Sequence, residues 1–326
     1  MKTKIKTLCL IMIAILFSII SCNKDDSDDN DGSLQFPSGW SSMDSGIDKI
    51  LLGVDFIDSK NGWAVGQDGT ILHTTDAGRT WSKQTSGTVE WLSGVHFIDK
   101  NKGWISGWGG KILHTTNGGD TWTEQTSGTS SSLYGVFFIN SLKGWIVGDQ
   151  GIVLNTTDAG NTWNTQNSTT SNKLNSISFI NSNAGWIVGV YGTIIHTTDG
   201  GNTWADQQSG FTNSFNSVCF TDNNTGWVVA CAGRIFHTTQ GGENLYDQSS
   251  GTSKYLFGVS FFDGNIGWAV GNDGTIVHTI DAGSTWTEQI SQTTNHLKSV
   301  CFINKDVGWA VGHNGTILHT ENGGDI

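Results

Sequence analysis

The strongest constraint on the fold of this chain is a Gly-Trp pair that returns every 41 residues. The pairs place tryptophans at Trp63, Trp104, Trp145, Trp186, Trp227, Trp268 and Trp309. A period of about 40–45 residues matches one four-stranded blade of a β-propeller, and such a unit buries its apolar faces only against its neighbours. Seven repeats therefore predict an all-β, seven-bladed β-propeller.

Each repeat contains short runs of β-branched and aromatic residues separated by Gly, Asn and Asp. In the second repeat these runs predict strands at Leu92–Ile98, Gly103–Gly107, Lys111–Thr116 and Trp122–Gln125. The composition agrees, because 326 residues include 44 Gly and a single Pro, which suits tight turns between many strands. No helical periodicity follows residue 22, so we expect no other kind of domain.

A second tryptophan series predicts how the ring closes. It comprises Trp40, Trp81, Trp122, Trp163, Trp204 and Trp286, with Leu245 in its place once. The chain ends at Ile326, one residue before the next member is due, and Trp40 is positioned to supply it. We expect the strand after Trp40 to pair in the same blade as Gly315–Thr320. This closure leaves no sheet edge exposed.

The second series ends a motif of the form Thr-Thr-Asp-Ala-Gly-Arg-Thr-Trp, found at Thr74–Trp81. Its carboxylate is expected to accept hydrogen bonds from amides of its own turn, its Gly to adopt a left-handed conformation, and its Trp to be largely buried. The corresponding position holds Asp76, Asn117, Asp158, Asp199, Asp281 and Asn322. We interpret these residues as structural. In the variant at Thr238–Leu245 a Gln replaces the Asp, which predicts the weakest hairpin.

Six histidines share one repeat position and raise the question of a metal site. They are His73, His114, His196, His237, His278 and His319, with Asn155 in the remaining repeat. Equivalent positions in blades that fan out around an axis lie too far apart to share an ion with ligand bonds of about 2 Å. We expect packing or hydrogen-bonding roles and no metal or cofactor. Asp68 and Asp273 precede Gly, so we interpret them as hairpin-turn residues.

The N-terminus has the features of a lipoprotein export signal. Residues 1–21 begin with lysines and continue into a short apolar run that ends at Ser21, and Cys22 follows as the residue that would carry lipid. An ordinary cleaved signal with an unmodified Cys22 is the alternative. Residues 22–37 form an acidic, flexible tether before a propeller at 38–326. The tether, which resembles a surface-export signal, favours an outer-membrane lipoprotein exposed at the cell surface, and a solvated linker is compatible with the same residues.

The formal net charge of −12 argues against nucleic acid as a partner, because such a surface repels phosphates. Three cysteines remain after the signal and Cys22, namely Cys219, Cys231 and Cys301. Their number is odd and their spacing is not that of metal ligands. We expect small buried apolar residues, with a Cys219–Cys231 disulfide as the alternative.

The repeat resembles a known family at Gly185–Gly189, with the sequence Gly-Trp-Ile-Val-Gly, together with Asp199–Trp204. Over residues 40–326 the chain resembles the photosystem II stability and assembly factor-like family of Asp-box, or bacterial neuraminidase repeat, propellers. The resemblance implies a seven-bladed fold, a structural role for the Asp box, and binding of an assembling membrane protein through a basic patch. Arg79 and Arg234 are the only arginines here, so we expect another partner.

The same boxes occur in glycoside hydrolases and sialidases, which provide the alternative function. Sialidases hold the substrate carboxylate with three arginines, and this chain has two. Other glycosidases need two carboxyl groups about 5–9.5 Å apart. The candidate acids Asp48, Glu90 and Asp149 lie in different repeats without an evident pairing. We therefore predict a non-enzymatic binding or scaffold protein.

Positions that vary between repeats locate the candidate binding surface. One slot before the first strand holds Trp91, Tyr255 or His296, and a slot in the turn between the second and third strands holds Trp108, Asp149 or His313. Including nearby tyrosines, the candidate residues are Trp91, Trp108, Tyr134, Tyr191, Tyr255, His296 and His313. Loop aromatics commonly stack on sugars or anchor peptides. These residues predict a protein or glycan ligand, with local packing as the alternative.

Overall fold

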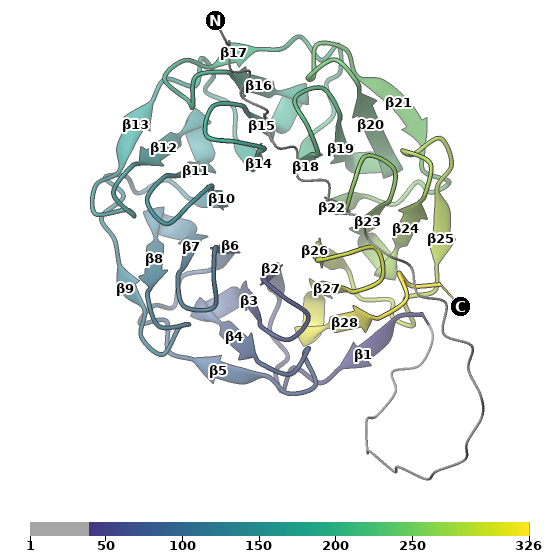
Figure 1. The fold of residues 1–326 in the computed structure, drawn as a ribbon, viewed down its shortest axis with the longest axis horizontal. Coiled ribbons are helices and arrows are strands. Elements are labelled where there is room, and N and C mark those ends of the chain that lie inside the picture. The colour runs from purple at the N-terminus through teal and green to yellow at the C-terminus, as the bar shows by residue number, and fades with distance from the viewer. Residues whose placement is uncertain (1–38, 326) are drawn as a thin grey trace, which may run out of the picture. The chain divides into compact units, whose positions relative to one another are not determined.

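The computed structural model describes residues 39–325, which form seven four-stranded antiparallel sheets around a common axis (Figure 1). The predicted seven-bladed propeller is confirmed. Blades 1 to 6 each use four consecutive strands, from β2–β5 to β22–β25. Blade 7 joins β26, β27 and β28 to β1 from the other end of the chain. Cys22 and the predicted signal and tether lie outside the described residues.

Every blade has the same strand layout from the axis outward. The innermost strands are β2 (Leu51–Phe56), β6 (Leu92–Phe97), β10 (Leu133–Phe138), β14 (Leu174–Phe179), β18 (Phe215–Phe220), β22 (Leu256–Phe261) and β26 (Leu297–Phe302). The second strands are β3 (Gly62–Gly66), β7 (Gly103–Gly107), β11 (Gly144–Gly148), β15 (Gly185–Gly189), β19 (Gly226–Ala230), β23 (Gly267–Gly271) and β27 (Gly308–Gly312). The third strands are β4 (Ile71–Thr74), β8 (Ile112–Thr115), β12 (Val153–Thr156), β16 (Ile194–Thr197), β20 (Arg234–Thr238), β24 (Ile276–Thr279) and β28 (Ile317–Thr320). The outer strands are β5 (Ser82–Gln84), β9 (Thr123–Glu124), β13 (Asn164–Gln166), β17 (Ala205–Asp206), β21 (Tyr246–Ser249), β25 (Thr287–Gln289) and β1 (Ser41–Met43).

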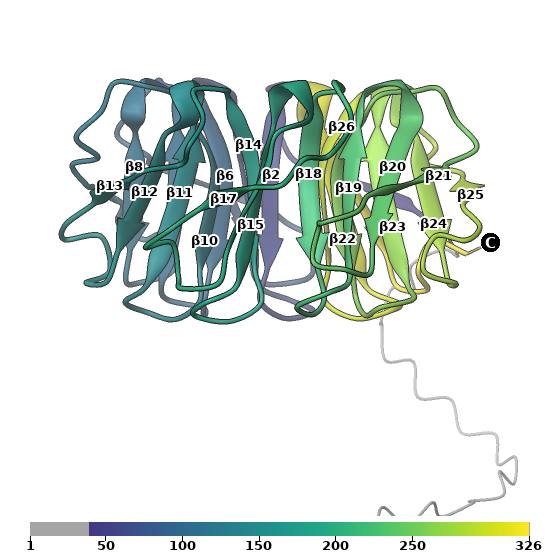
Figure 2. The same cartoon turned by 90° about the horizontal axis from the view of Figure 1, so that it is seen from above.

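The connections gather at two opposite faces of the propeller (Figure 2). We call one the variable face. It carries the loops that lead into the innermost strands and the turns η1 (Gln67–Gly69), η2 (Trp108–Gly110), η3 (Asp149–Gly151), η4 (Val190–Gly192), η5 (Cys231–Gly233), η6 (Asn272–Gly274) and η7 (His313–Gly315). The Asp boxes lie on the opposite face, between the third and outer strands. Among the described residues no helix is long and apolar enough to cross a membrane.

The N-terminal strand closes the ring as the sequence predicts. Strand β1 pairs with β28 in the register Ser41↔His319. Trp40 is fully buried and its Nε1 donates to Gln289 Oε1 of blade 6 over 2.9 Å. The Gly39 amide donates to Asn322 Oδ1 over 3.2 Å, so the last Asp box is completed by residues from both ends of the described chain.

The Gly-Trp tryptophans form the contacts between neighbouring blades. Trp186 is sandwiched between His196 of its own blade and Phe220 of the next, at ring-centroid distances of 4.6 and 3.7 Å. Its Nε1 donates to the Gly241 carbonyl over 2.7 Å. All seven tryptophans of this series are fully buried. The six repeated histidines each stack on a Gly-Trp tryptophan, so their predicted packing role is confirmed.

The Asp boxes act as self-contained turns. Asp76 Oδ1 accepts from the Thr80 amide over 2.9 Å, and its Oδ2 accepts from the Thr80 hydroxyl. Burial by itself would raise the pKa of Asp76, but the hydrogen bonds from Thr80 and Thr74 together outweigh it and lower the pKa. Gly78 has φ +87°, as expected for the left-handed position. The box tryptophans are less uniformly buried than predicted, since Trp204 is 4% exposed whereas Trp122 is only partly buried.

The degenerate box of blade 5 has lost part of this network but not its strand pairing. Thr238 Oγ1 still accepts from the Gln240 and Gly242 amides. The β20–β21 ladder nevertheless spans four residue pairs, more than any other pairing of a third with an outer strand. The predicted weakening of this hairpin is therefore not visible in its length. The described cysteines are free, which makes the Cys219–Cys231 alternative wrong, and they are partly rather than fully buried.

A glutamine at the end of most outer strands links its blade to the next Asp box. Gln84 Nε2 donates to the Gly118 carbonyl over 2.8 Å, and its Oε1 accepts from Trp122 Nε1 over 3.1 Å. Two blade interfaces lack this link. Gln207 Oε1 is buried without a partner among the described residues because Leu245 replaces the tryptophan. Trp81 Nε1 is likewise buried and unpaired, because Met43 occupies the glutamine position of blade 7.

We predict that Met43→Gln stabilises the protein by about 1–2 kcal/mol, because it gives an acceptor to a buried donor in a side chain of similar length. The measurement is the free energy of unfolding in denaturant. Met43→Leu is the control and should give no gain. A Met43→Gln variant no more stable than Met43→Leu would show that the Trp81 indole needs no partner.

Candidate recognition surface

Backbone hydrogen bonds bring the two variable slots of a blade together. The first residue of the turn donates its amide to the carbonyl of the residue before the innermost strand. This bond joins Trp108 to Trp91 over 2.8 Å and His313 to His296 over 2.9 Å. The scaffold therefore presents paired side chains whose identity differs from blade to blade.

In blade 2 the pair is two indoles. Trp91 and Trp108 stack with centroids 4.7 Å apart and planes inclined by 18°. Trp108 is 38% exposed, so part of its ring remains available to a ligand. The Trp91 ring beneath it limits the rotamers of Trp108. The Trp108 side chain therefore loses little conformational entropy when a ligand stacks on it.

Blade 3 combines an aromatic ring with an acidic side chain of its own and a lysine from the slot before the innermost strand of blade 4. The Tyr134 hydroxyl donates to Asp149 Oδ2 over 3.0 Å, and Lys173 Nζ lies 3.8 Å from the Tyr134 ring centroid. Burial and the Asp149 carboxylate raise the pKa of Tyr134 to about 12. Burial lowers the pKa of Lys173, against an opposing effect of Asp149. The Asp149 carboxylate thus already has a partner in the Tyr134 hydroxyl.

Blade 7 presents two imidazoles. His296 and His313 meet edge to face at 5.0 Å, and the Asp273 amide donates to His296 Nδ1 over 3.0 Å. Lys254 pairs with the Asp273 side chain. Burial lowers the pKa of His313, and Lys298 and His296 add to this effect. His313 therefore stays neutral at physiological pH and offers an uncharged polar ring.

The innermost strands surround a cavity of about 240 Å³ at the axis. Its variable positions are Leu52, Ser93, Tyr134, Asn175, Asn216, Phe257 and Lys298. Lys298 Nζ lies 3.6 Å from the Phe257 ring centroid, and burial lowers the Lys298 pKa. The sequence argument missed Phe257, Lys298 and Lys173. Alignment of the repeats carries the signal that would have found them. Phe257 and Lys298 are second residues of innermost strands, a position that varies, and Lys173 occupies the same slot as Trp91.

The predicted site residues do not form one cluster. Trp91 contacts Trp108 and His296 contacts His313, whereas Tyr134 contacts Asp149 and lines the axial cavity. Tyr255 is 50% exposed, and Tyr191 borders a separate pocket in blade 4. Asp68 has φ +55° and precedes Gly69 at φ +67°, the geometry of a type I′ hairpin turn. The turn interpretation of Asp68 is thus confirmed.

Comparison with protein families gives one match that spans the propeller. The family described as photosynthesis system II assembly factor YCF48 matches residues 34–128, 123–209, 163–248, 207–291 and 247–326. No curated protein sequence matches the chain significantly.

Solved structures share the fold at low sequence identity. The structure described as YCF48 bound to D1 peptide is 21% identical, with a TM-score of 0.75 over 87% of this chain and 95% of the other. YCF48 from Cyanidioschyzon merolae is 19% identical, with a TM-score of 0.73 over 87% and 99% of the two chains. An inactive virginiamycin B lyase from Staphylococcus aureus is 14% identical, with a TM-score of 0.76 over 86% and 98%. These similarities concern the fold alone.

Proposed function

The chain belongs to the family of the photosynthesis system II assembly factor YCF48, and from this premise we propose that it is a non-enzymatic propeller that binds a protein partner on its variable face. One observation carries the proposal. The residues that build the scaffold recur in nearly every blade, whereas those around the axial cavity and in the paired slots differ. A binding site requires such local differences, while the scaffold does not. The related structure with a bound D1 peptide is a precedent for peptide binding on this fold.

The side chains suggest the chemistry of that partner. Trp108 offers an exposed indole, and Lys173 and Lys298 hold ammonium groups over aromatic rings near the axial cavity. We infer a peptide segment that places an apolar or aromatic side chain on Trp108 and an acidic group near the lysines. An enzymatic role has less support, because Asp149 is engaged by Tyr134 and the arginines number only two.

Replacing Trp108 by alanine is predicted to leave stability within about 1 kcal/mol, since other blades carry unrelated residues there. Recovery of the partner in a crosslinked pull-down from intact cells should fall at least about tenfold. Tyr246→Ala is the matched control, because Tyr246 is an exposed aromatic residue on an outer strand. Undiminished recovery of the partner by the Trp108→Ala variant would show that Trp108 is not part of the binding site. A large decrease in the melting temperature of that variant would identify Trp108 as a packing residue instead.

We further propose that the propeller is tethered to the cell envelope through lipid on Cys22, as an outer-membrane protein exposed at the surface. The support is the signal-like sequence before Cys22 and the acidic segment after it. Cys22→Ala should move the protein from the membrane fraction to the soluble fraction. Unchanged fractionation, together with no incorporation of labelled fatty acid into the wild type, would contradict the anchor.

A further inference from the structure

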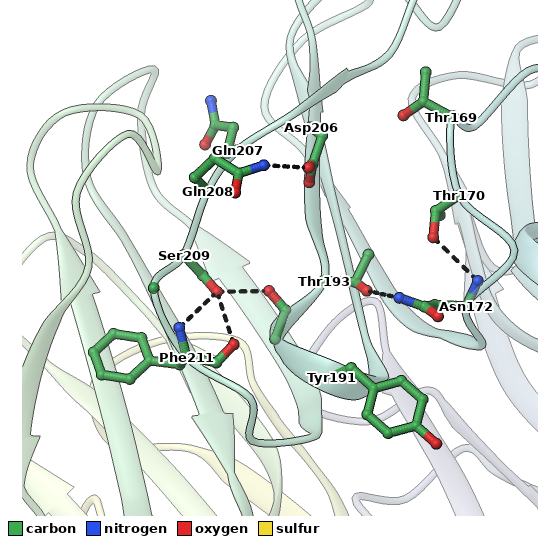
Figure 3. A pocket seen from close by; sticks show the side chains of 12 residues that line it. Thr169, Thr170, Asn172, Tyr191, Thr193, Asp206, Gln207, Gln208, Ser209 and Phe211 are labelled. Carbon is green, nitrogen blue, oxygen red and sulfur yellow. Dashed lines mark hydrogen bonds between the residues drawn. The ribbon is translucent and has the colours of Figure 1, made fainter.

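Blade 4 contains a pocket of about 290 Å³ at the outer part of the variable face (Figure 3). One wall is the turn at Tyr191 and Gly192, and another is the segment from Asp206 to Phe211. The loop that carries Thr170 and Asn172 closes a third side. The corresponding grooves of blades 1, 5 and 6 are not lined by the preceding loop. The volume is close to the lower limit of roughly 300 Å³ for small-molecule sites, which suits one sugar ring.

Tyr191, at the edge of this pocket, is an unusual choice for its backbone position. Its φ of +57° is left-handed, a conformation that a bulky residue adopts only at an energetic cost of about 1 kcal/mol or more. The equivalent residues in the other blades are Asp68, Gly109, Gln150, Ala232, Asp273 and Asn314. Tyr191 is 73% exposed, so packing does not repay that cost. An exposed ring held in this way suits a stacking platform.

The pocket also keeps an acid without a basic partner. In blade 2 Lys111 pairs with Glu124 over 2.7 Å, and in blade 5 Arg234 pairs with Asp247. The matching pair in blade 4 is Thr193 and Asp206. Among the described residues, no lysine or arginine forms a salt bridge with Asp206. The short Thr193 side chain thus leaves the pocket open. The Asp206 carboxylate remains available as a hydrogen-bond acceptor.

The remaining polar groups are held in place by their own hydrogen bonds. Asn172 Nδ2 donates to Thr193 Oγ1 over 2.8 Å, and Thr193 Oγ1 donates to the Val190 carbonyl over 2.7 Å. Gln208 Nε2 donates to Asp206 Oδ2, and Ser209 Oγ donates to the Gly192 carbonyl. Figure 3 shows these side chains on opposite sides of the pocket, with Tyr191 at its lower edge. The pocket therefore joins an aromatic ring to fixed hydroxyl, amide and carboxylate groups.

We propose that this pocket is a subsite for an uncharged hexose residue of an oligosaccharide, lined by other residues of the variable face than the paired slots and the axial cavity proposed for the protein partner. The sugar stacks one face on Tyr191 and shares its hydroxyls among Asp206, Asn172 and Gln208. Sialic acids and uronic acids are disfavoured, because their carboxylates would approach Asp206 without a compensating cation. This inference goes beyond the proposed function and uses none of the residues assigned to it.

The test uses the purified protein on a glycan array that carries neutral hexose oligosaccharides beside sialylated and uronate-containing ones. Wild type is expected to bind neutral glycans in preference to acidic ones. Titration calorimetry with the best-bound array glycan should show affinity lowered at least about tenfold by Tyr191→Asn, which copies Asn314 and suits the turn. Thr193→Arg, which copies the ion pair of blade 5, should fill the pocket and have a similar effect.

Thr275→Arg is the matched control, since it introduces the same residue at the same position of blade 6, and its affinity should equal that of wild type. Unchanged melting temperatures would show that the blade 4 variants are folded. No binding to any array glycan would overturn the proposal, and so would glycan binding that survives Tyr191→Asn. A protein partner that depends on Tyr191 in the absence of glycan binding would also overturn it. None of these results bears on partner capture through Trp108, so the two proposals fail separately.

Discussion

Replacing Trp104 by alanine is expected to destabilise the propeller by about 3–5 kcal/mol. The indole is fully buried, stacks on Phe138 of the next blade at a centroid distance of 3.6 Å, and stacks on His114 at 4.7 Å. Its Nε1 also donates to the Ala159 carbonyl over 3.1 Å. The substitution would leave a cavity between two blades that neither rigid sheet can collapse to fill. The Ala159 carbonyl would lose one of its two hydrogen bonds and keep the one from Gln125 Nε2.

Unfolding in denaturant measures this loss, and Trp108→Ala serves as the comparison within the same blade. Both variants lose an indole, but Trp108 is 38% exposed whereas Trp104 is fully buried. We expect the second variant to lose at most about 1 kcal/mol. Equal losses would mean that stacking between blades contributes no more than contacts on the variable face.

A second large effect is expected from acid. Burial, with a smaller contribution from the Arg79 charge, lowers the pKa of His319 from the ordinary value of 6.5 to about 4. The folded state therefore binds this proton less readily than the unfolded state. The free energy of unfolding is therefore undiminished above about pH 6.5 and decreases as the pH falls towards 4. Relative to neutral pH, the pKa shift of His319 lowers the free energy of unfolding by about 3 kcal/mol at pH 4 and by about 2 kcal/mol at pH 5.

The other repeated histidines act in the same direction, because burial also lowers the pKa values of His73, His114, His196, His237 and His278. Asp55 opposes them, since burial raises its pKa and its protonation at low pH then favours the folded state. Unfolding free energies at pH 7.5 and pH 5 measure the balance. His319→Asn should remove about 2 kcal/mol of the difference.

Asn155 is the precedent for that variant, because it occupies the same position in blade 3 and donates to the Gly144 carbonyl over 2.9 Å. The His319→Asn protein should therefore fold and respond less steeply to acid than wild type. An unchanged pH dependence would show that the acid response comes from groups outside the stacked histidines.

The sequence alone determined the architecture, because each repeat contains the strand pattern and the turn residues of one blade. Trp63 and its six equivalents fix the period, the Asp76 boxes fix one set of turns, and Gly69 and its equivalents fix the other. The second tryptophan series also predicts how the ring closes, because Trp40 belongs to it and takes the place of this tryptophan in blade 7. These are local or strictly periodic constraints, so they can be read without knowing which blades touch.

Tertiary structure decided the rest, since the remaining contacts join residues about one repeat apart whose partners vary. Only the fold shows that Met43 leaves the Trp81 indole unpaired, or that Trp122 is less buried than Trp104. It also gathers Lys298 and Phe257 beside the axial cavity and leaves Tyr191 in a pocket of its own. The physical reason is that a repeat specifies the position of a backbone. What a side chain at that position contacts depends on the two neighbouring blades.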